Sequence, residues 1–164
     1  MKKKSPKESL TEIERLVLPA DTNIFNALYG GHLMEWIDNV ASIVAIKHGR
    51  RRAVTGSIDS LFFLSPIQLG DIVRLEGRIN HVTRSTMEIE VDVFSQEGLT
   101  GTTSFTTKAY LTYVAVDQSG RPTEVPPLLL ETDEEKLRFS NGEERSKERM
   151  RLLHKIKEEA KGSP

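Results

Sequence analysis

The sequence of 164 residues contains no cysteine and one tryptophan, and aromatic residues make up only 6% of it. The absence of cysteine excludes disulfide bonds, thiolate nucleophiles and metal sites with thiolate ligands. The sequence also lacks the G-x-S-x-G pattern of a nucleophile elbow, which excludes a serine triad on an α/β-hydrolase scaffold. The length fits one domain and is too short for a (β/α)8 barrel.

Long apolar runs and an excess of one charge are also absent. No stretch approaches the roughly 20 apolar residues of a membrane span, and the lysines at positions 2–4 are followed by polar residues instead of the apolar segment of a secretion signal. We therefore expect a cytoplasmic protein without a membrane span. The formal net charge of −1 gives no basic footprint for nucleic acid. The four histidines show no ligand-like spacing, so no metal site is expected.

Charged residues are concentrated near the C-terminus. The segment 131–164 contains nine acidic and nine basic residues, and it follows the consecutive prolines Pro126 and Pro127. Because two prolines end regular structure, we divide the chain into a core domain of residues 1–130 and a charged tail of residues 131–164. Leu152, Leu153 and Ile156 recur at helical spacing, which predicts a thin amphipathic helix that is accessory to the core.

The core contains one long apolar helix and several strands. Residues 33–46 are apolar except for one stripe at i, i+3, i+4 and i+7, which predicts a helix that ends before Gly49 and is surrounded by protein. The period of two over residues 87–93 predicts a half-buried strand. Further strands are predicted at 13–18, 53–63, 73–80 and 103–116. Short turns between successive strands favour antiparallel pairing.

These elements predict an α+β fold, in the order strand, helix and four strands. An antiparallel β-sheet of about five strands would wrap around one long central helix, which is the arrangement called the hot-dog fold. One helix covers one face of such a sheet, so the remaining face or an edge needs a partner chain. The sequence therefore predicts a homo-oligomer.

The polar residues between Asp21 and Ser42 are the best candidates for chemistry. Gly30 and Gly31 directly precede the helix, whose unpaired N–H groups can bind a phosphate or the oxyanion of an attacked carbonyl. Asp38, two turns later, could act as a general base on water or attack a carbonyl itself. Spacing alone leaves simpler roles open: Asp38 on the wet face of the helix, the glycines in a tight turn and Asn23 as a turn residue.

Segments along the core resemble the motif regions of the hot-dog acyl-CoA thioesterases. They occur in the order of the family between residues 13 and 127. The segments are 16–19, 21–23, 30–38, 59–67, 69–71, 84–87, 113–117, 120–122 and 125–126. The resemblance implies hydrolysis of fatty acyl-CoA to a free fatty acid and CoA, without a cofactor. It also implies an oligomer built from dimers that pair into a tetramer or close into a hexamer, a trimer of dimers.

The resemblance assigns catalytic roles to three residues. Asp38 corresponds to the general base or nucleophile, Asn23 helps place the thioester carbonyl or the water, and the backbone N–H of Gly30 polarises the carbonyl. In this family Asp and Asn of one site come from different subunits. Asn26 stands where many relatives have Gly, so the turn before Gly30 can differ in detail.

The resemblance also assigns substrate-binding roles. Arg84 with Ser85 resembles the coenzyme A contact, and Thr86 continues that segment. Gly31 belongs to the helix N-terminus, and Ser60 could reach the reacting water. Thr83, just before the coenzyme A contact, again replaces a Gly of many relatives.

Two other functions fit the same fold. A hydratase or dehydratase on acyl thioesters needs a catalytic His paired with an acid, and the helix has only His32, at its entry. A non-catalytic module that binds or senses acyl-CoA would be expected together with a DNA-binding segment, and no helix-turn-helix precedes the core. The thioesterase is therefore the favoured hypothesis.

Overall fold

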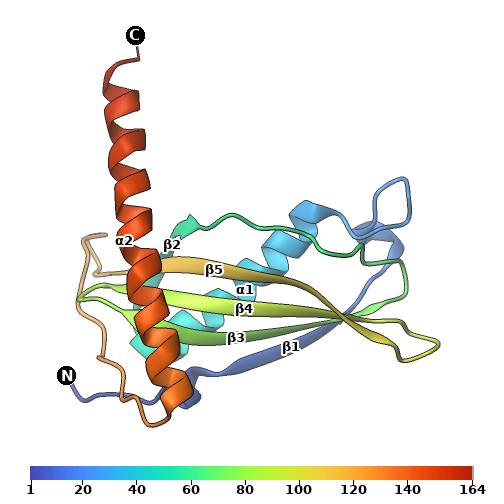
Figure 1. The fold of residues 1–164 in the computed structure, drawn as a ribbon, viewed down its shortest axis with the longest axis horizontal. Coiled ribbons are helices and arrows are strands. Elements are labelled where there is room, and N and C mark those ends of the chain that lie inside the picture. The colour runs from blue at the N-terminus through green and yellow to red at the C-terminus, as the bar shows by residue number, and fades with distance from the viewer. Residues whose placement is uncertain (164) are drawn as a thin grey trace.

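The computed structural model describes residues 1–163, which contain five strands and two long helices (Figure 1). The strands are β1 (Thr11–Leu16), β2 (Arg52–Ile58), β3 (Ile72–Val82), β4 (Thr86–Gln96) and β5 (Thr103–Val116). The helices are α1 (Gly30–Gly49) and α2 (Asp133–Lys161), and two short 3-10 helices cover Pro6–Ser9 and Pro19–Asp21. None of these helices is long and apolar enough to cross a membrane.

The five strands form one antiparallel sheet with the order β1-β3-β4-β5-β2. The consecutive strands β3, β4 and β5 are joined by short turns, whereas β1 and β2 lie at the two edges. The sheet curls around α1, which lies behind it in the view of Figure 1. The hot-dog arrangement and the element order predicted from the sequence are confirmed.

α1 packs on the inner face of the sheet through an apolar surface that includes Val40 and Val44, both completely buried. The closest approach is at Gly77 of β3, where an added Cβ would lie 2.6 Å from Cγ1 of Val40. The helix is longer than predicted at its C-terminal end. Gly49 is still helical, and Arg50 ends α1 in a left-handed conformation (φ 49°) with its N–H donating to the carbonyl of Ile46.

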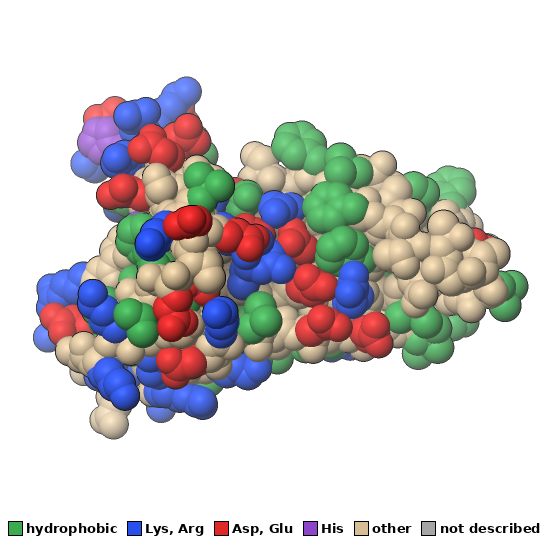
Figure 2. Space-filling model, turned by 60° about the horizontal axis from the view of Figure 1, so that its bottom comes forward, with side chains coloured by type: hydrophobic (Ala, Val, Ile, Leu, Met, Phe, Trp, Pro, Cys, Tyr) green, Lys and Arg blue, Asp and Glu red, His purple; other side chains and the backbone are tan. Residues whose placement is uncertain are grey.

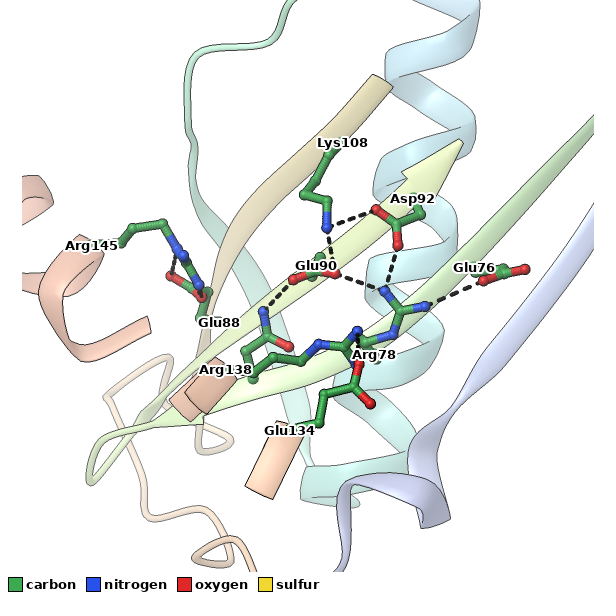
Figure 3. A network of polar contacts seen from close by, with 10 residues as sticks. Glu76, Arg78, Glu88, Glu90, Asp92, Lys108, Glu134, Arg138 and Arg145 are labelled. Carbon is green, nitrogen blue, oxygen red and sulfur yellow. Dashed lines mark hydrogen bonds and ion pairs between the residues drawn. The ribbon is translucent and has the colours of Figure 1, made fainter. Parts of the chain in front are cut away.

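β4 is buried on both faces of the sheet, whereas the sequence predicts a strand that is buried on one face only. Glu88, Glu90 and Asp92 alternate with the core residues as predicted, but they are only 2%, 3% and 8% exposed. Arg78 donates to Glu90 at 2.7 Å and to Asp92 at 2.6 Å, and Lys108 pairs with both acids (Figure 3). The alternation could not reveal this burial because the covering cations come from other elements, Arg78 of β3 and Lys108 of β5 for Glu90 and Asp92, and the C-terminal helix for Glu88.

α2 covers one end of this outer face and then continues away from the body of the molecule (Figure 1). Its first half packs closely, since Gly142 is buried and an added Cβ there would lie 2.7 Å from Cβ of His81. The ring of Phe139 packs against the ring of His81, with 4.7 Å between the ring centres and the planes tilted by 55°. From residue 150 to its end at Lys161 the helix is exposed. The helix in the tail therefore begins earlier than predicted, and part of it serves as a cover for the sheet.

Because the space at Gly77 is already filled by two valines of α1, we expect Gly77→Ala to lower the free energy of unfolding by about 1–3 kcal/mol through overpacking. Urea unfolding at a fixed protein concentration measures this change. Gly49→Ala is the matched control, since an added Cβ there meets its nearest atoms at an ordinary 3.7 Å. Equal stability of both variants would contradict close packing of α1 on β3.

Candidate active site

The carboxylate of Asp38 lies where α1, β2 and β5 meet. Its Oδ1 accepts hydrogen bonds from the hydroxyl of Thr55 at 2.9 Å and from the hydroxyl of Tyr113 at 2.6 Å. The hydroxyl of Tyr113 also lies 2.9 Å from the backbone carbonyl of Asp38. Among residues 1–163 no group donates to Oδ2. One carboxylate oxygen is therefore held by the protein and the other is available to a substrate or water.

The pairing of β2 with β5 explains why these side chains meet. Thr55 and Tyr113 are directly opposite one another, so both side chains point to the same face of the sheet, toward α1. The register shifts between Thr55 and Ser57, which leaves Gly56 as an extra residue of a β-bulge. An added Cβ on Gly56 would lie 3.2 Å from the side chain of Val114, so a larger residue would crowd this bulge.

Burial raises the pKa of Tyr113 above its usual range, and its hydrogen bond to Asp38 raises it further. The Tyr113 hydroxyl is therefore protonated at neutral pH and acts as a donor to the carboxylate. The short 2.6 Å hydrogen bond from this hydroxyl fixes the direction in which Oδ1 of Asp38 points. The two hydroxyls thus keep the Asp38 carboxylate of α1 in one orientation.

The N-terminus of α1 presents free donors. The first helical hydrogen bond runs from the N–H of Leu33 to the carbonyl of Tyr29, and the N–H groups of Gly30 and Gly31 have no acceptor among the described residues. The ring of Phe63 lies close to this turn, at 3.8 Å from the position of a Cβ on Gly30. These N–H groups can donate hydrogen bonds to the oxyanion that forms when a carbonyl is attacked.

Asn23 lies in the loop before α1 and stabilises that loop. Its Oδ1 accepts the backbone N–H groups of Phe25 at 2.8 Å and Ala27 at 3.2 Å. Asn26 adopts φ 58°, a left-handed conformation that Asn tolerates well. Because Oδ1 is occupied, the Nδ2 group of Asn23 is the part of the side chain that is left for a substrate. No hydrogen bond connects Asn23 with Asp38 within residues 1–163.

The predicted coenzyme A contact lies away from Asp38, in the turn between β3 and β4. The backbone carbonyl of Ser85 accepts from Ala115 at 2.8 Å, and the N–H of Thr86 donates to the hydroxyl of Thr83. Arg84 is 80% exposed, and its Nε lies 3.2 Å from Glu124. A cavity of about 450 Å³ opens beside Arg84, with apolar walls that include Leu128, Leu130 and Phe139.

The turn between β3 and β4 lies toward the C-terminal end of α1, whereas Asp38 lies nearer its middle. Met87, the residue after Thr86, contacts the position of a Cβ on Gly49 at 3.7 Å. Gly49 follows Asp38 by 11 residues in α1, which corresponds to about 16 Å along the helix axis. The structure places Gly30, Gly31 and Asp38 on one helix, and no hydrogen bond joins Asn23 or residues 84–86 to Asp38 among the described residues.

Two residues around Asp38 were missed in the sequence. Thr55 occurs in a predicted strand with nothing to distinguish it, and Tyr113 appeared only as the first residue of a motif segment. The register of β2 on β5 was needed to find them. Ser60, predicted as a substrate-binding residue, is exposed in the segment that follows β2.

Exposed apolar side chains gather on the half of the molecule away from the tip of α2 (Figure 2). They come from the free edge strand β2, the loop before α1 and the segment after β2. Examples are Ile24, Phe25, Val54, Phe62 and Leu64. Exposed apolar side chains that gather on one part of a folded chain mark a candidate interaction site.

The fold and the site thus define a hot-dog protein with an oriented carboxylate and a free helix N-terminus on one face of its sheet. The family model described as the thioesterase superfamily matches residues 25–102. An uncharacterized acyl-CoA thioester hydrolase of Bacillus subtilis, YkhA, is 42% identical over 143 residues, which are 87% of this chain and 83% of that protein. This chain belongs to the thioesterase superfamily, so the family inferred from the motif segments is confirmed.

Solved structures agree with this assignment. An acyl-CoA hydrolase from Staphylococcus aureus in complex with butyryl coenzyme A and coenzyme A is 34% identical, with a TM-score of 0.89 and 96% of each chain covered. A hexameric acyl-CoA thioesterase is 39% identical, with a TM-score of 0.88, covering 93% of this chain and 98% of its own.

Variants of the Staphylococcus aureus hydrolase with an Asn, an Asp or a Thr replaced by Ala have also been solved. In sequence order, the replaced residues are separated by 15 and 17 positions. Asn23, Asp38 and Thr55 are separated by the same 15 and 17 positions here. The spacing of these three residues is thus shared with an enzyme of the same fold.

The raised pKa of Tyr113 predicts a loss of stability in alkali. Above pH ~10 a tyrosine in the unfolded chain loses its proton, whereas folded Tyr113 keeps it, so unfolding releases a proton and becomes more favourable. Relative to Tyr113→Phe, we expect the unfolding free energy of the wild type to fall by up to about 1.4 kcal/mol per pH unit above that pH. Urea unfolding of both proteins at pH 9 and 11 measures the difference, and parallel losses would contradict the buried, protonated hydroxyl.

Proposed function

We propose that this protein is an acyl-CoA thioester hydrolase in which Asp38 is the general base or nucleophile. The family and the enzymes of the same fold support the reaction. The observation that carries the proposal is the carboxylate of Asp38, with Oδ1 held by Thr55 and Tyr113 and Oδ2 left free. A carboxylate fixed in this way is prepared to act on a water or a carbonyl carbon without reorganising.

The chemistry follows from these groups. Oδ2 of Asp38 takes a proton from a water molecule while the water oxygen bonds to the thioester carbonyl carbon. The negative charge that develops on the carbonyl oxygen is stabilised by the N–H of Gly30, with the positive end of the α1 dipole behind it. The carbon–sulfur bond then breaks, and the coenzyme A thiolate takes the proton. In the nucleophilic alternative Oδ2 attacks the carbonyl carbon directly and the carbon–sulfur bond breaks, so that coenzyme A leaves as the thiolate and an anhydride with Asp38 remains. Water then hydrolyses this anhydride to the free fatty acid and the Asp38 carboxylate, and the proton that water releases goes to the thiolate.

Asn23 contributes a donor from a second copy of the chain. Its Oδ1 is occupied by two backbone N–H groups, so Nδ2 is the group that can reach the thioester carbonyl or the attacking water. Three observations support a site shared between subunits: no bond from Asn23 to Asp38 within one chain, exposed apolar residues on β2 and the hexameric thioesterase of the same fold. We propose an oligomer built from dimers, with a hexamer as its complete form.

The nucleotide end of the substrate lies toward the turn of Arg84, Ser85 and Thr86. The pantetheine arm runs between this turn and the reacting carbonyl near Asp38. Phosphates of the substrate displace Glu124 as the partner of Arg84, because a multiply charged anion attracts the guanidinium more strongly. Gly31 and Ser60 line the path near the thioester. The cytoplasmic location stays a prediction from the sequence.

The alternative of a hydratase is disfavoured by the position of its histidine. His32 lies 3.4 Å from Asp21 and so has an acidic partner. His32 is in the first turn of α1 and Asp21 is in the 3-10 helix before it, however, and His32 has no hydrogen bond to the cluster of Asp38, Thr55 and Tyr113 among the described residues. Release of free thiol from acyl-CoA, followed with a chromogenic thiol reagent across a panel of acyl chain lengths, tests hydrolysis directly. A module that only binds acyl-CoA would release none.

Asp38→Asn keeps the size of the side chain but removes its basicity. We expect kcat to fall by at least ~10²-fold with KM little changed, the pattern for a group that acts in the transition state. Glu35→Gln is the matched control, because Glu35 is an exposed acid on the same helix one turn earlier. Near-normal turnover of folded Asp38→Asn would refute the assignment.

The shared site predicts complementation between two inactive variants. Asn23→Asp keeps the oxygen that holds the loop but loses the Nδ2 donor, so it should be inactive without misfolding. In a mixed dimer of Asn23→Asp and Asp38→Asn, one site carries both defects and the other carries neither. Random pairing of equal amounts should therefore restore about a quarter of wild-type activity.

The result is compared with each variant expressed alone and with a mixture of separately purified proteins. If Asn23 and Asp38 of one site belonged to the same chain, every site would carry one defect and co-expression would give no recovery. Such a result would leave the role of Asp38 intact and remove the shared site.

A further inference from the structure

The chain between β2 and Ile67 passes close to the site, and its first six residues, Asp59 to Leu64, are called the 59–64 segment here. The segment has no regular strand structure. It runs alongside β5 and is joined to it by few hydrogen bonds. The N–H of Asp59 donates to the carbonyl of Tyr110 at 3.0 Å. Farther along, the hydroxyl of Thr107 donates to the carbonyl of Phe62 at 2.7 Å, and the N–H of Leu64 donates to the carbonyl of Thr106. The position of the segment therefore depends on a small number of contacts.

The 59–64 segment connects two parts of the proposed active site. It continues from β2, whose Thr55 donates to Asp38. At the fifth residue of the segment, the ring of Phe63 lies over the first turn of α1, near the free N–H of Gly30. A shift of the segment would move Phe63 away from the place where the thioester carbonyl is expected.

Arg149 of α2 binds the start of this segment from the outer face of the sheet. Its Nη1 donates to Oδ2 of Asp59 at 2.9 Å, and its Nη2 donates to Oε2 of Glu88 at 2.7 Å. The Arg149 side chain is 16% exposed, and that of Glu88 is 1% exposed. Because both pairs are largely removed from water, they constrain geometry more strongly than surface ion pairs do.

Arg145, one turn earlier on α2, provides a natural comparison. It also binds Glu88, with Nη2 at 2.7 Å and Nε at 3.2 Å, and its guanidinium lies 3.8 Å from the ring centre of Tyr110. Arg145 has no hydrogen bond to Asp59. Among the described residues Arg149 alone pairs with Asp59, and it is followed on α2 only by exposed residues.

We propose that Arg149 is a positioning residue of the thioesterase: through Asp59 it holds the 59–64 segment so that Phe63 remains over the N-terminus of α1 and the acyl thioester binds in register. The inference rests on the proposed function, since it concerns how that substrate is held. Arg149 does not touch the reacting atoms. It acts through Asp59, and the C-terminal helix thereby becomes a part of the substrate site.

The effect should appear in substrate binding. Asp38, Thr55, Tyr113 and Gly30 do not depend on the Arg149–Asp59 pair, so we expect Arg149→Gln to leave kcat within about two-fold of wild type and to raise KM about 10-fold. Asp59→Asn should have the same effect, and the double variant should be no worse than either single variant. Arg149→Lys, which keeps the charge, should recover part of the loss.

Arg145→Gln is the matched control, because it removes a cation from the same Glu88 and the same helix but leaves the pair with Asp59. Its KM should stay near that of wild type. A merely structural role of α2 would lower the amount of active enzyme, so kcat would fall with KM unchanged in all variants. Equal KM values for Arg149→Gln and wild type, or an equal rise in Arg145→Gln, would overturn the proposal.

Hydrogen exchange tests the link without reference to turnover. Amides of residues 59–66 should exchange faster in Arg149→Gln than in wild type or Arg145→Gln, since fewer contacts hold the segment. If the wild type released no thiol from any acyl-CoA, the proposed function would fail, while the exchange result would still decide whether Arg149 holds the segment. Unchanged exchange in Arg149→Gln would refute the positioning role even in an active enzyme.

Discussion

The close contact between α1 and the inner face of the sheet is the constraint on which the rest of this structure depends. At Gly77 the backbone of β3 and the valines of α1 approach so closely that no side chain fits between them. The helix is thereby fixed in rotation as well as in position, and Asp38 is held toward β2 and β5 instead of solvent. A carboxylate with that orientation meets Thr55 and Tyr113, whose hydroxyls occupy one of its oxygens.

The outer face follows a different principle. Acidic residues of β4 are buried there under cations from β3, β5 and α2 (Figure 3). Ion pairs therefore cover β4 on this face, most of which has no helix packed on it. Such pairs require partners with matching geometry, because an unpaired buried charge is costly. The cations that α2 supplies to Glu88 also bring Arg149 to Asp59, which connects the outer face to the segment beside the active site.

Much of the fold could be predicted from periodicity. The apolar helix, the alternating strands and their antiparallel order were recognised because each depends on a local repeat of two or 3.6 residues. The motif segments led to Asp38, Asn23 and Gly30 as catalytic candidates and to the family. The alternation on β4 was misleading about burial, since Glu88 looks like a solvent-facing residue until Arg145 and Arg149 of α2 are placed above it.

The sequence by itself determined the main elements, their order and the family. It also identified candidate residues that lie close together in the chain, such as Gly30 and Asp38. Only the tertiary structure decided which distant side chains meet: Thr55 and Tyr113 at one carboxylate, and Arg149 at Asp59. The physical reason is that such contacts depend on strand register, including the extra residue at Gly56, and on how a helix crosses a sheet. Register and crossing are set by packing over the whole core, and no local repeat in the chain records them.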